Sequence, residues 1–268
     1  MFLRFCLALV LLAAPALAQD ATPEQPFGAL DRLGANSLMS ESTGVRAANL
    51  IRRGRIFSIG RDYAAPRPDA PDQLGTRLFG LGALSQDGVY YNRLEPNDLA
   101  ALAMPRLKPF FTRGLMIDLV SLRGRAMRAG EVITAEDIET WLEWKDLKPP
   151  KPGDVVIFNT GWGRHWGTDN ATYLGGAPGI GADATEWLIK HRVALVGADT
   201  WAVEAQRPSA AQSFSHRRAL MVENGIYLQA NLETARIIDA EIAEFAYIFA
   251  PLPIEGAHEA PGVPLIAY

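Results

Sequence analysis

The chain has almost no cysteine. Cys6 is the only one among its 268 residues, so no disulfide can form within one chain and core packing must stabilise the fold. The apolar run at residues 5–12 is also too short to cross a bilayer, which takes roughly 20 apolar residues. These two scarcities exclude a disulfide-stapled domain and argue against a membrane-spanning helix in this run.

The N-terminal residues instead have the pattern of a signal peptide. Arg4 gives a positive start, the apolar run follows, and Ala16-Leu17-Ala18 forms a small-residue cleavage site before Gln19. A buried N-terminal helix is the alternative interpretation. Because charge, apolar run and cleavage site follow in the order of a signal peptide, we expect residues 1–18 to be removed and residues 19–26 to be a flexible N-terminus. The protein is then expected to be exported, to the periplasm or the extracellular space.

Positive charge is scarce as well. The formal net charge is −4, and loss of Arg4 with the signal peptide would make it −5. The one dense basic cluster, at residues 52–55, is short and typical of a solvated helix end. Nucleic-acid binding depends on basic residues that neutralise backbone phosphates. The sequence therefore predicts no nucleic-acid partner, and no membrane association after cleavage.

Two common catalytic and nucleotide-binding motifs are missing. The chain has no G-x-S-x-G nucleophile elbow. Residues 175–181 are rich in glycine but lack the lysine of a phosphate-binding loop. The sequence thus predicts neither a serine hydrolase of the elbow type nor a nucleotide-binding protein.

Apolar segments and helix signals alternate over the second half of the chain. Strands are predicted at residues 55–60, 115–122, 155–158, 193–197, 225–228 and 246–252, and helices at residues 40–53, from Thr134 onward and at residues 182–191. This alternation predicts an α/β or mixed sheet that is covered by helices. About 250 residues can bury one large core, so we expect residues 27–268 to form a single domain.

One stretch has the frame of a metal-hydrolase motif without its ligands. The motif reads H-x-G-T-H-x-D-x-x-x-H, and Gly75-Thr76 stand at its Gly-Thr. Its three His positions and its Asp position are held by other residues: Gln73, Arg77 and Ala83 for His, and Phe79 for Asp. A divalent metal needs imidazole nitrogen or carboxylate oxygen that converges on one point. Phe79 and Ala83 can supply neither.

Sequence blocks along nearly the whole mature chain resemble the cyclase family of hydrolases, which includes bacterial kynurenine formamidases and isatin-hydrolase-like enzymes. The strongest block is PGDVVIFNTGW at residues 152–162. The other blocks follow in the order of the family, at residues 27–30, 47–54, 87–92, 112–119, 178–181, 197–204 and 251–257. Each block alone is weak, but the ordered set is specific.

The resemblance implies a fold and a chemistry. The fold is a mixed α+β, swivelling β/β/α arrangement in which a mixed sheet is partly closed into a barrel and flanked by helices. Family members are usually dimers or tetramers, so we expect a homo-oligomer. Many bind zinc or manganese, and the metal activates a water molecule that attacks a formamide or cyclic amide carbonyl. The partner implied is a small-molecule substrate or ligand.

This sequence departs from the family at the metal site. The later family histidine falls at or next to His216, and the later glutamate falls at Ala230. Catalytic zinc typically keeps about three protein ligands. We therefore expect no metal and no other cofactor at the substituted site.

A rebuilt site is expected around Arg77. Its permanent charge would stand where the metal cation stands in the family, and it could bind a carboxylate or an oxyanion. The alternative is that Arg77 points to solvent or pairs with an acid. His258 could act as a general base near neutral pH, and His216 is the third catalytic candidate. Candidate substrate-binding residues are Gln73, Phe79, Tyr90, Trp162 and Trp201, of which the aromatic ones could equally belong to the core.

Two functions remain open on the sequence alone. The first is hydrolysis of a small formamide or cyclic amide, as in an arylformamidase, at a rebuilt site without the usual metal. The second is binding of a small aromatic acid by a catalytically silent protein on the same scaffold. Family resemblance does not decide between them, because function depends on the site.

Overall fold

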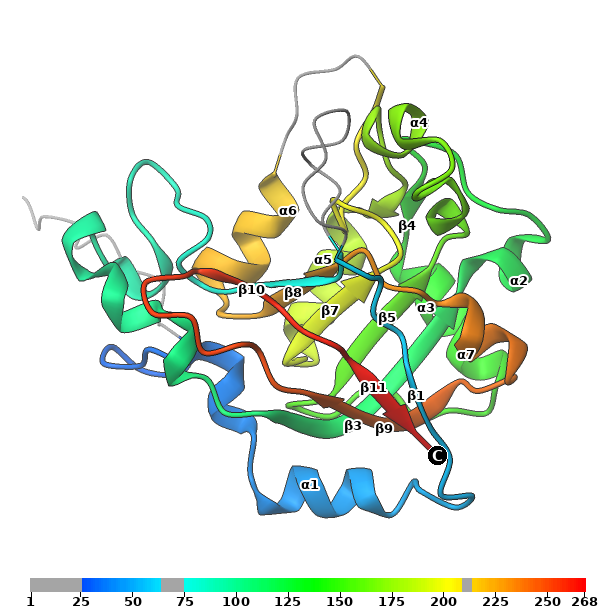
Figure 1. Ribbon diagram of the computed structural model, residues 1–268, viewed down its shortest axis with the longest axis horizontal. Helices are drawn as coiled ribbons and strands as arrows, with labels where there is room; N and C mark the ends of the chain where they lie inside the picture. Colours follow the sequence, from blue (N-terminus) through cyan, green and yellow to red (C-terminus); the bar gives the residue numbers. More distant parts are fainter. Residues whose placement is uncertain (1–25, 64–74, 209–213) are drawn as a thin grey trace, which may run out of the picture.

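The computed structural model describes residues 26–63, 75–208 and 214–268, and within them a nine-stranded mixed sheet forms the centre of the molecule (Figure 1). Its strand order is β1-β11-β9-β3-β5-β7-β8-β2-β10. The four strands β3, β5, β7 and β8 run parallel, and every other neighbouring pair is antiparallel. The sheet curls into a half-open barrel with helices around it, which confirms the predicted mixed fold.

The strands of this sheet are short at its ends and longest in the middle. They are β1 (Ile56–Ser58), β2 (Arg77–Phe79), β3 (Phe110–Asp118), β5 (Val155–Asn159), β7 (Leu195–Ala198), β8 (Tyr227–Ala230), β9 (Glu244–Phe249), β10 (Glu259–Pro261) and β11 (Leu265–Ala267). A separate parallel pair consists of β4 (Val132–Ile133) and β6 (Gly179–Ile180).

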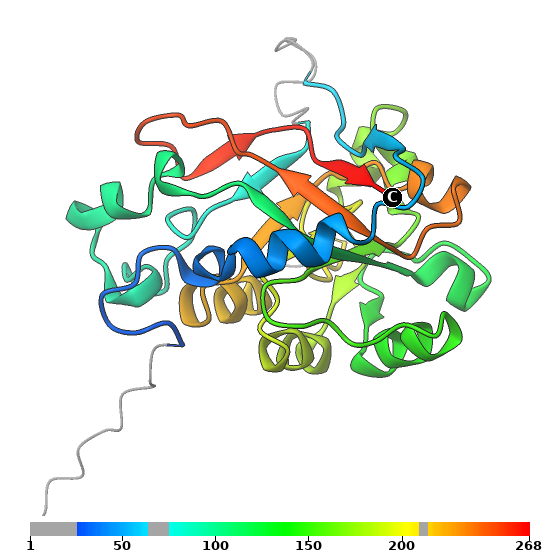
Figure 2. The ribbon, with the colours of Figure 1, turned by 90° about the horizontal axis from the view of Figure 1, so that it is seen from below.

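Helices cover the sheet from two sides (Figure 2). The helix α1 (Glu41–Ala48) packs across β3 and β9, whereas α3 (Ala135–Trp144) and α5 (Ala182–Lys190) pack against each other on another side. The shorter helices are α2 (Leu119–Arg123), α4 (Asn170–Leu174), α6 (Ser215–Arg218) and α7 (Ala235–Asp239), and a π-helical turn at Ala219–Glu223 continues α6. None of the helices in the described part has the length and apolar character needed to cross a bilayer.

The core lies on the parallel strands. Every residue of β5 and β7 is buried, as expected for strands that are covered on both faces. On β3, Gly114 pairs with Phe245 of β9, and a Cβ at Gly114 would come within 2.2 Å of the Phe245 ring. Only glycine therefore fits at this position, because the ring occupies the space of a side chain.

A buried ion-pair cluster fixes the start of β5 against β3. The Arg113 guanidinium lies 3.0 Å from Asp154 and 2.5 Å from Glu244. Asp154 is fully buried, and its other carboxylate oxygen lies 3.2 Å from Arg46 of α1. One carboxylate thus joins a helix and two strands.

The predicted elements exist, but several boundaries differ. Ser40 and Thr134, which begin two of the predicted helices, each form a capping box, with Thr43 and Asp137 respectively. The first helix ends at Ala48 and not near residue 53, because the chain then turns to pair Arg53 and Arg55 with the C-terminal Tyr268. The strand predicted at residues 115–122 is β3, which ends at Asp118 because that side chain caps α2.

Candidate functional site

The strand β2, which carries part of the substituted motif, lies between β8 and β10 and is antiparallel to both. Arg77 lies directly across from Ala230 of β8, and Phe79 lies across from Glu259 of β10. Side chains alternate along a strand, so Arg77 and Phe79 share one face of the sheet while Leu78 is buried on the other. The two substituted ligand positions of this strand therefore remain neighbours in space.

Two arginine side chains lie over the ring of Phe79. The Cζ atom of Arg77 is 4.8 Å from the ring centroid, and that of Arg217, from α6, is 4.4 Å away. Phe79 itself is only 5% exposed. A guanidinium within about 6 Å of an aromatic ring is attracted to its face, and burial strengthens the attraction. The ring of Phe79 thus contacts the charged groups of Arg77 and Arg217, which are 140 residues apart in the sequence.

Main-chain oxygens hold Arg217 in place. Its Nε donates to the carbonyl of Ala202 at 3.0 Å, and one terminal nitrogen donates to that of Trp201 at 3.2 Å. Burial lowers the pKa of Arg217 to about 10, and neighbouring Glu204 opposes this shift while Arg77 adds to it. Arg217 remains a cation at neutral pH. Because its charge is buried, an anion bound beside it would be stabilised.

Glu204 lies beside Arg217 and is buried. One carboxylate oxygen accepts from the backbone N–H of His216 at 2.9 Å and from that of Arg217 at 3.4 Å. The other oxygen, Oε1, has no hydrogen-bond partner within the described residues. Burial raises the pKa of Glu204 to about 7, against the opposing effect of these N–H groups and of Arg217. At neutral pH the group is therefore divided between its acid and its carboxylate form.

His216 enters the cluster through its main chain. Its N–H binds Glu204, and burial lowers the pKa of its imidazole. Over the described ranges, no hydrogen bond of its ring is present. The histidine predicted as a catalytic candidate therefore lies next to Arg217, and its ring is neutral at pH 7.

His258 lies beside the turn that follows β2. Its carbonyl accepts from the N–H of Gly80 at 2.8 Å, and its ring fills the space over Gly82, where a Cβ would come within 2.2 Å of Nδ1. That Nδ1 atom is buried and has no hydrogen-bond partner in the described part of the chain. The next residue, Glu259, is the one that reaches Arg77, at 3.4 Å. Among the described residues, β10 thus brings a carboxylate, and not the imidazole, to Arg77.

The remaining predicted binding residues are spread more widely. Trp162 is buried after β5 and donates to the carbonyl of Tyr173, and Tyr90 packs against the edge of the main core. Trp201 is half-buried, donates to Gly176, and accepts from Arg217 through its carbonyl. Gln73 lies outside the described residues. Among the predicted binding residues that the structure describes, Phe79 and the main chain of Trp201 contact the two arginines.

Sequence reasoning missed three members of the cluster: Tyr63, Arg217 and Glu259. The Tyr63 hydroxyl donates to the Thr76 carbonyl, and burial raises the pKa of Tyr63 to about 12 although Arg77 opposes this. Of the three, Arg217 would have been the easiest to predict from the sequence. It follows His216 directly and lies in a short aromatic and basic segment that begins at Phe214. Glu259 gave no signal apart from its position after His258.

The described side chains around β2 do not offer the ligand set of a divalent metal. In the described part of the chain, no group of three or more His, Cys, Asp or Glu residues could hold one. Three of the buried polar side-chain atoms without a partner there lie around β2: Arg77 Nε, Glu204 Oε1 and His258 Nδ1. Buried polar atoms are normally hydrogen-bonded, so each exception asks for an explanation. Two guanidinium groups around one ring suit an anion, not a cation.

Comparison with known proteins agrees with the fold. The Cyclase family model matches residues 67–205, and the chain belongs to this family. A crystal structure of a novel cyclase superposes with a TM-score of 0.80 at 23% identity, over 91% of this chain and 99% of that one. Isatin hydrolase A from Labrenzia aggregata, bound to benzyl benzoate, gives 0.56 at 20% identity, over 81% and 84% of the two chains. A potential metal-dependent hydrolase with cyclase activity gives 0.51 at 17% identity, over 79% and 96%. No curated protein is significantly similar to the chain.

Proposed function

We propose that the side chains of Arg77, Phe79 and Arg217 form a metal-free site for a small organic anion of the aromatic or cyclic carboxylic acid class. One observation carries the proposal: two guanidinium groups lie within 4.8 Å of the centroid of one buried ring. The nearest acids do not fully neutralise them. Glu259 is 42% exposed and 3.4 Å from Arg77, and Glu204 is only partly ionised at neutral pH.

The shape of these groups favours a planar carboxylate. A guanidinium presents a flat fork of N–H groups that matches two carboxylate oxygens, and it stacks on aromatic faces. Phe79 offers one such face, and Phe214 lies 4.9 Å from Arg217. A ligand that combines a flat ring with a carboxylate would satisfy both the charge and the apolar surface.

A second candidate function, hydrolysis of a small formamide or cyclic amide at the same site, is favoured by Glu204. With a pKa of about 7 and a free oxygen, its carboxylate can take a proton from water. The hydroxide oxygen would then bond to the carbonyl carbon, and the carbonyl oxygen would become an oxyanion beside the arginines. Cleavage of the C–N bond returns the proton from Glu204 to the leaving nitrogen, which gives a carboxylic acid and an amine, and the acid then loses its proton to water.

A binding experiment tests the first proposal. Purified protein is titrated calorimetrically with benzoate, and with benzamide as the neutral molecule of the same shape. We expect benzoate to bind, benzamide to bind far more weakly, and a chelator to change neither. Binding that disappears with chelator, together with stoichiometric zinc or manganese by elemental analysis, would show that the site is a metal site after all.

A turnover assay tests the second candidate. N-formylkynurenine and a cyclic amide are incubated with the wild-type protein and with the Glu204→Gln variant, each with and without chelator. Metal-free turnover that Glu204→Gln abolishes would support hydrolysis. Benzoate binding without turnover of either substrate would leave the binding function alone.

Export and assembly are further proposals. The order of Arg4, an apolar run and Ala16-Leu17-Ala18 supports cleavage after residue 18 and export. N-terminal sequencing of the protein from a periplasmic or culture fraction tests this, and an intact N-terminus there would contradict it. Light scattering after size-exclusion chromatography tests the proposed dimer or tetramer, and a molecular mass near that of one mature chain would contradict it.

A further inference from the structure

A cavity lies at the carboxyl ends of β5 and β7. It has a volume of about 530 Å³. Its walls come from the segments that follow β1, β5, β7 and β8, and its lining includes Arg61, Trp166, Asp199, Glu233 and Ile238. In sheets with parallel strands, ligands bind outside the carboxyl ends of those strands. None of Arg77, Phe79, Glu204 and Arg217 lines this cavity.

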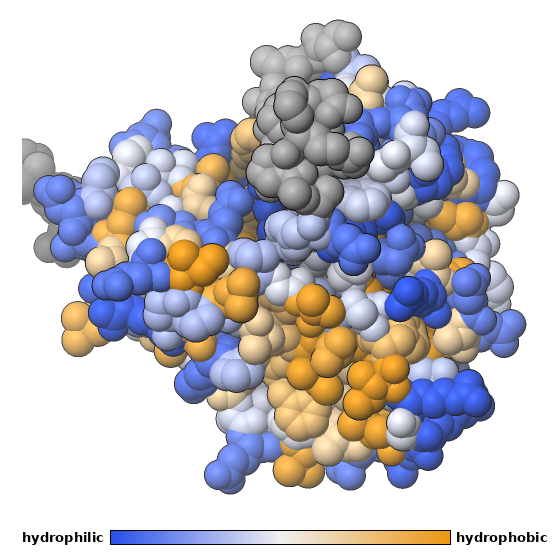
Figure 3. Space-filling model, in the orientation of Figure 1, coloured by the Kyte–Doolittle hydropathy of each residue, from blue (hydrophilic) through white to orange (hydrophobic). Residues whose placement is uncertain are grey.

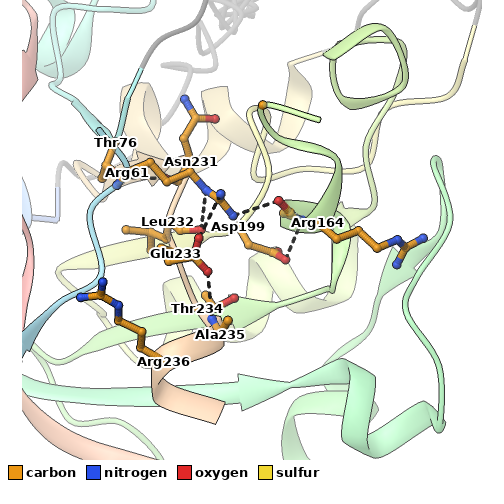
Figure 4. A network of polar contacts seen from close by, with 12 residues as sticks. Arg61, Thr76, Arg164, Asp199, Asn231, Leu232, Glu233, Thr234, Ala235 and Arg236 are labelled. Atoms are coloured by element: carbon orange, nitrogen blue, oxygen red, sulfur yellow. Dashed lines mark hydrogen bonds and ion pairs between the residues drawn. The ribbon is translucent and has the colours of Figure 1, made fainter. Parts of the chain in front are cut away.

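Arg61 is the buried cation of this cavity (Figure 4). Its side chain is 8% exposed, and it donates to the carbonyls of Gly163 at 3.0 Å and of Leu232 at 3.3 Å. A terminal nitrogen lies 3.0 Å from the carboxylate of Glu233. A guanidinium has five N–H groups, and these contacts between described residues use three. One N–H on each terminal nitrogen is left for a further acceptor.

The carboxylate of Glu233 shows that the Arg61 guanidinium can bind a carboxylate. Its side chain is 33% exposed, so it lies at the rim while Arg61 lies within. Its other carboxylate oxygen accepts from the N–H of Ala235 at 3.3 Å, at the start of α7. An ion pair that is half open to water contributes little stability. Glu233 can therefore give up its place on Arg61 to a carboxylate that brings apolar surface with it.

The remaining walls suit an apolar body. The Arg61 guanidinium lies 4.9 Å from the centroid of the Trp166 ring, and Val120, Ala126 and Ile238 complete the apolar lining. The polar side chains nearby are already satisfied, since Thr234 donates to Asn159 at 2.7 Å and both oxygens of Asp199 accept hydrogen bonds. Figure 4 shows the Arg164 side chain directed away from Arg61. Arg61 is therefore the group that recognises charge inside the cavity.

We propose that this cavity is a second small-molecule site, which takes a carboxylic acid with a flat or short apolar body. The ligand carboxylate replaces that of Glu233 on Arg61, and the body lies between Trp166 and Ile238. Burial raises the pKa of Asp199, and hydrogen bonds from Thr160 and Gly163 occupy both of its oxygens. This site is separate from the proposed anion site on β2, and either can exist without the other.

The variant that tests this site is Glu233→Gln. Removal of Arg61 would also break its contacts to two loops, whereas glutamine keeps the size of Glu233 and can still accept from Ala235. Because the competing carboxylate is gone, we expect benzoate to bind roughly threefold more tightly. Trp166→Ala, which removes the apolar wall, should weaken binding. Glu186→Gln, an exposed position on α5, should change nothing.

The measurements are made by calorimetry in an Arg77→Gln background, which removes the site on β2. The indole N–H signal of Trp166 in a ¹⁵N spectrum reports binding in the cavity independently. No benzoate binding in this background, or a Glu233→Gln variant that binds no more tightly, would overturn the second site. If Arg77→Gln leaves benzoate affinity unchanged from that of the wild type, the proposed function alone is overturned. The two failures are therefore distinguishable.

Discussion

Arg77 lies directly across from Ala230 in the antiparallel pair of β2 and β8. Opposite residues in such a pair have Cβ atoms roughly 5 Å apart. The family resemblance places a metal ligand at each of these two positions. Here one position holds a fixed positive charge and the other only a methyl group. The guanidinium therefore has no acid across the strand pair at this position, and the proposed anionic ligand would lie beside it.

This pairing yields a first prediction, for Ala230→Glu. The new carboxylate would reach Arg77 across the strand pair and occupy the fork that we propose for the ligand. We expect benzoate affinity to fall by roughly tenfold, since a charge-assisted hydrogen bond is then already made within the protein. Calorimetric titration measures the change, in an Arg61→Lys background if the second cavity also binds.

The matched control is Ala230→Gln, which fills the same buried space without charge. It should weaken binding less than Ala230→Glu does. If both variants lose the same affinity, then volume and not charge explains the loss, and the role given to Arg77 is wrong.

The sequence predicted the scaffold well because its signals are local. Capping residues and fully apolar strands, such as those around Thr134 and Val155, mark elements whatever they pack against. It also placed Arg77 and Phe79 at the candidate site, since both stand in one motif. These signals depend on neighbours in the chain and need no knowledge of the fold.

The rest of the cluster could not be predicted, because its members are far apart in the sequence and meet only in the folded chain. Arg217 meets Phe79 only after the sheet brings β2 beside β8 and α6 packs over them. Glu204 lies in one of the family-like blocks, but its raised pKa depends on desolvation in the folded chain. Likewise, Glu259 reaches Arg77 through the pairing of β10 with β2. No residue spacing in the sequence predicts these contacts.

A second prediction concerns Phe79→Leu, which removes the ring that both arginines share. Leucine keeps the apolar burial but offers no aromatic face. We expect the free energy of unfolding to fall by about 1–2 kcal/mol and benzoate binding to weaken, because neither guanidinium is then held in place. Urea unfolding and calorimetry measure the two effects.

Phe214→Leu is the comparison variant, since Phe214 contacts Arg217 but not Arg77 among the described contacts. Its effect on binding should be smaller. Equal losses from the two variants would mean that Arg217 alone matters, and Arg77 would lose its place in the proposed site.

A third prediction tests the scaffold through Asp154→Asn. Asp154 is fully buried and neutralises Arg113, which is also largely buried. Without the Asp154 charge, Arg113 keeps its pair with Glu244 but Arg46 loses the carboxylate it pairs with, so one positive charge is left uncompensated and we expect a loss of about 3 kcal/mol in the free energy of unfolding. Urea denaturation at pH 7 measures it.

Glu131→Gln provides the contrast, because the Arg125–Glu131 pair lies at the surface. Water screens such a pair, and its loss should cost only a small fraction of the Asp154 effect. Similar losses in the two variants would contradict the idea that burial makes the Asp154 cluster important.

A fourth prediction follows from the pKa of Glu204, which burial raises from 4.5 to about 7. Between these two values the folded protein binds more protons at this group than the unfolded chain does. The contribution of Glu204 to stability is therefore complete below pH 4.5 and is lost as the pH rises through 7. The full change is about 3 kcal/mol at 1.36 kcal/mol per pKa unit. Urea unfolding of the wild type and of Glu204→Gln from pH 4.5 to pH 8 measures it.

The two proteins should be nearly equal in stability at pH 4.5, with Glu204→Gln the more stable above pH 7, because the glutamine never ionises. Benzoate affinity should follow the same group: ionised Glu204 competes for Arg217, so wild-type binding weakens from pH 6 to pH 8 while Glu204→Gln stays constant. Parallel pH profiles for the two proteins, in both stability and affinity, would mean that Glu204 titrates outside this window. Glu204 would then be neither a competitor for Arg217 nor a general base at neutral pH.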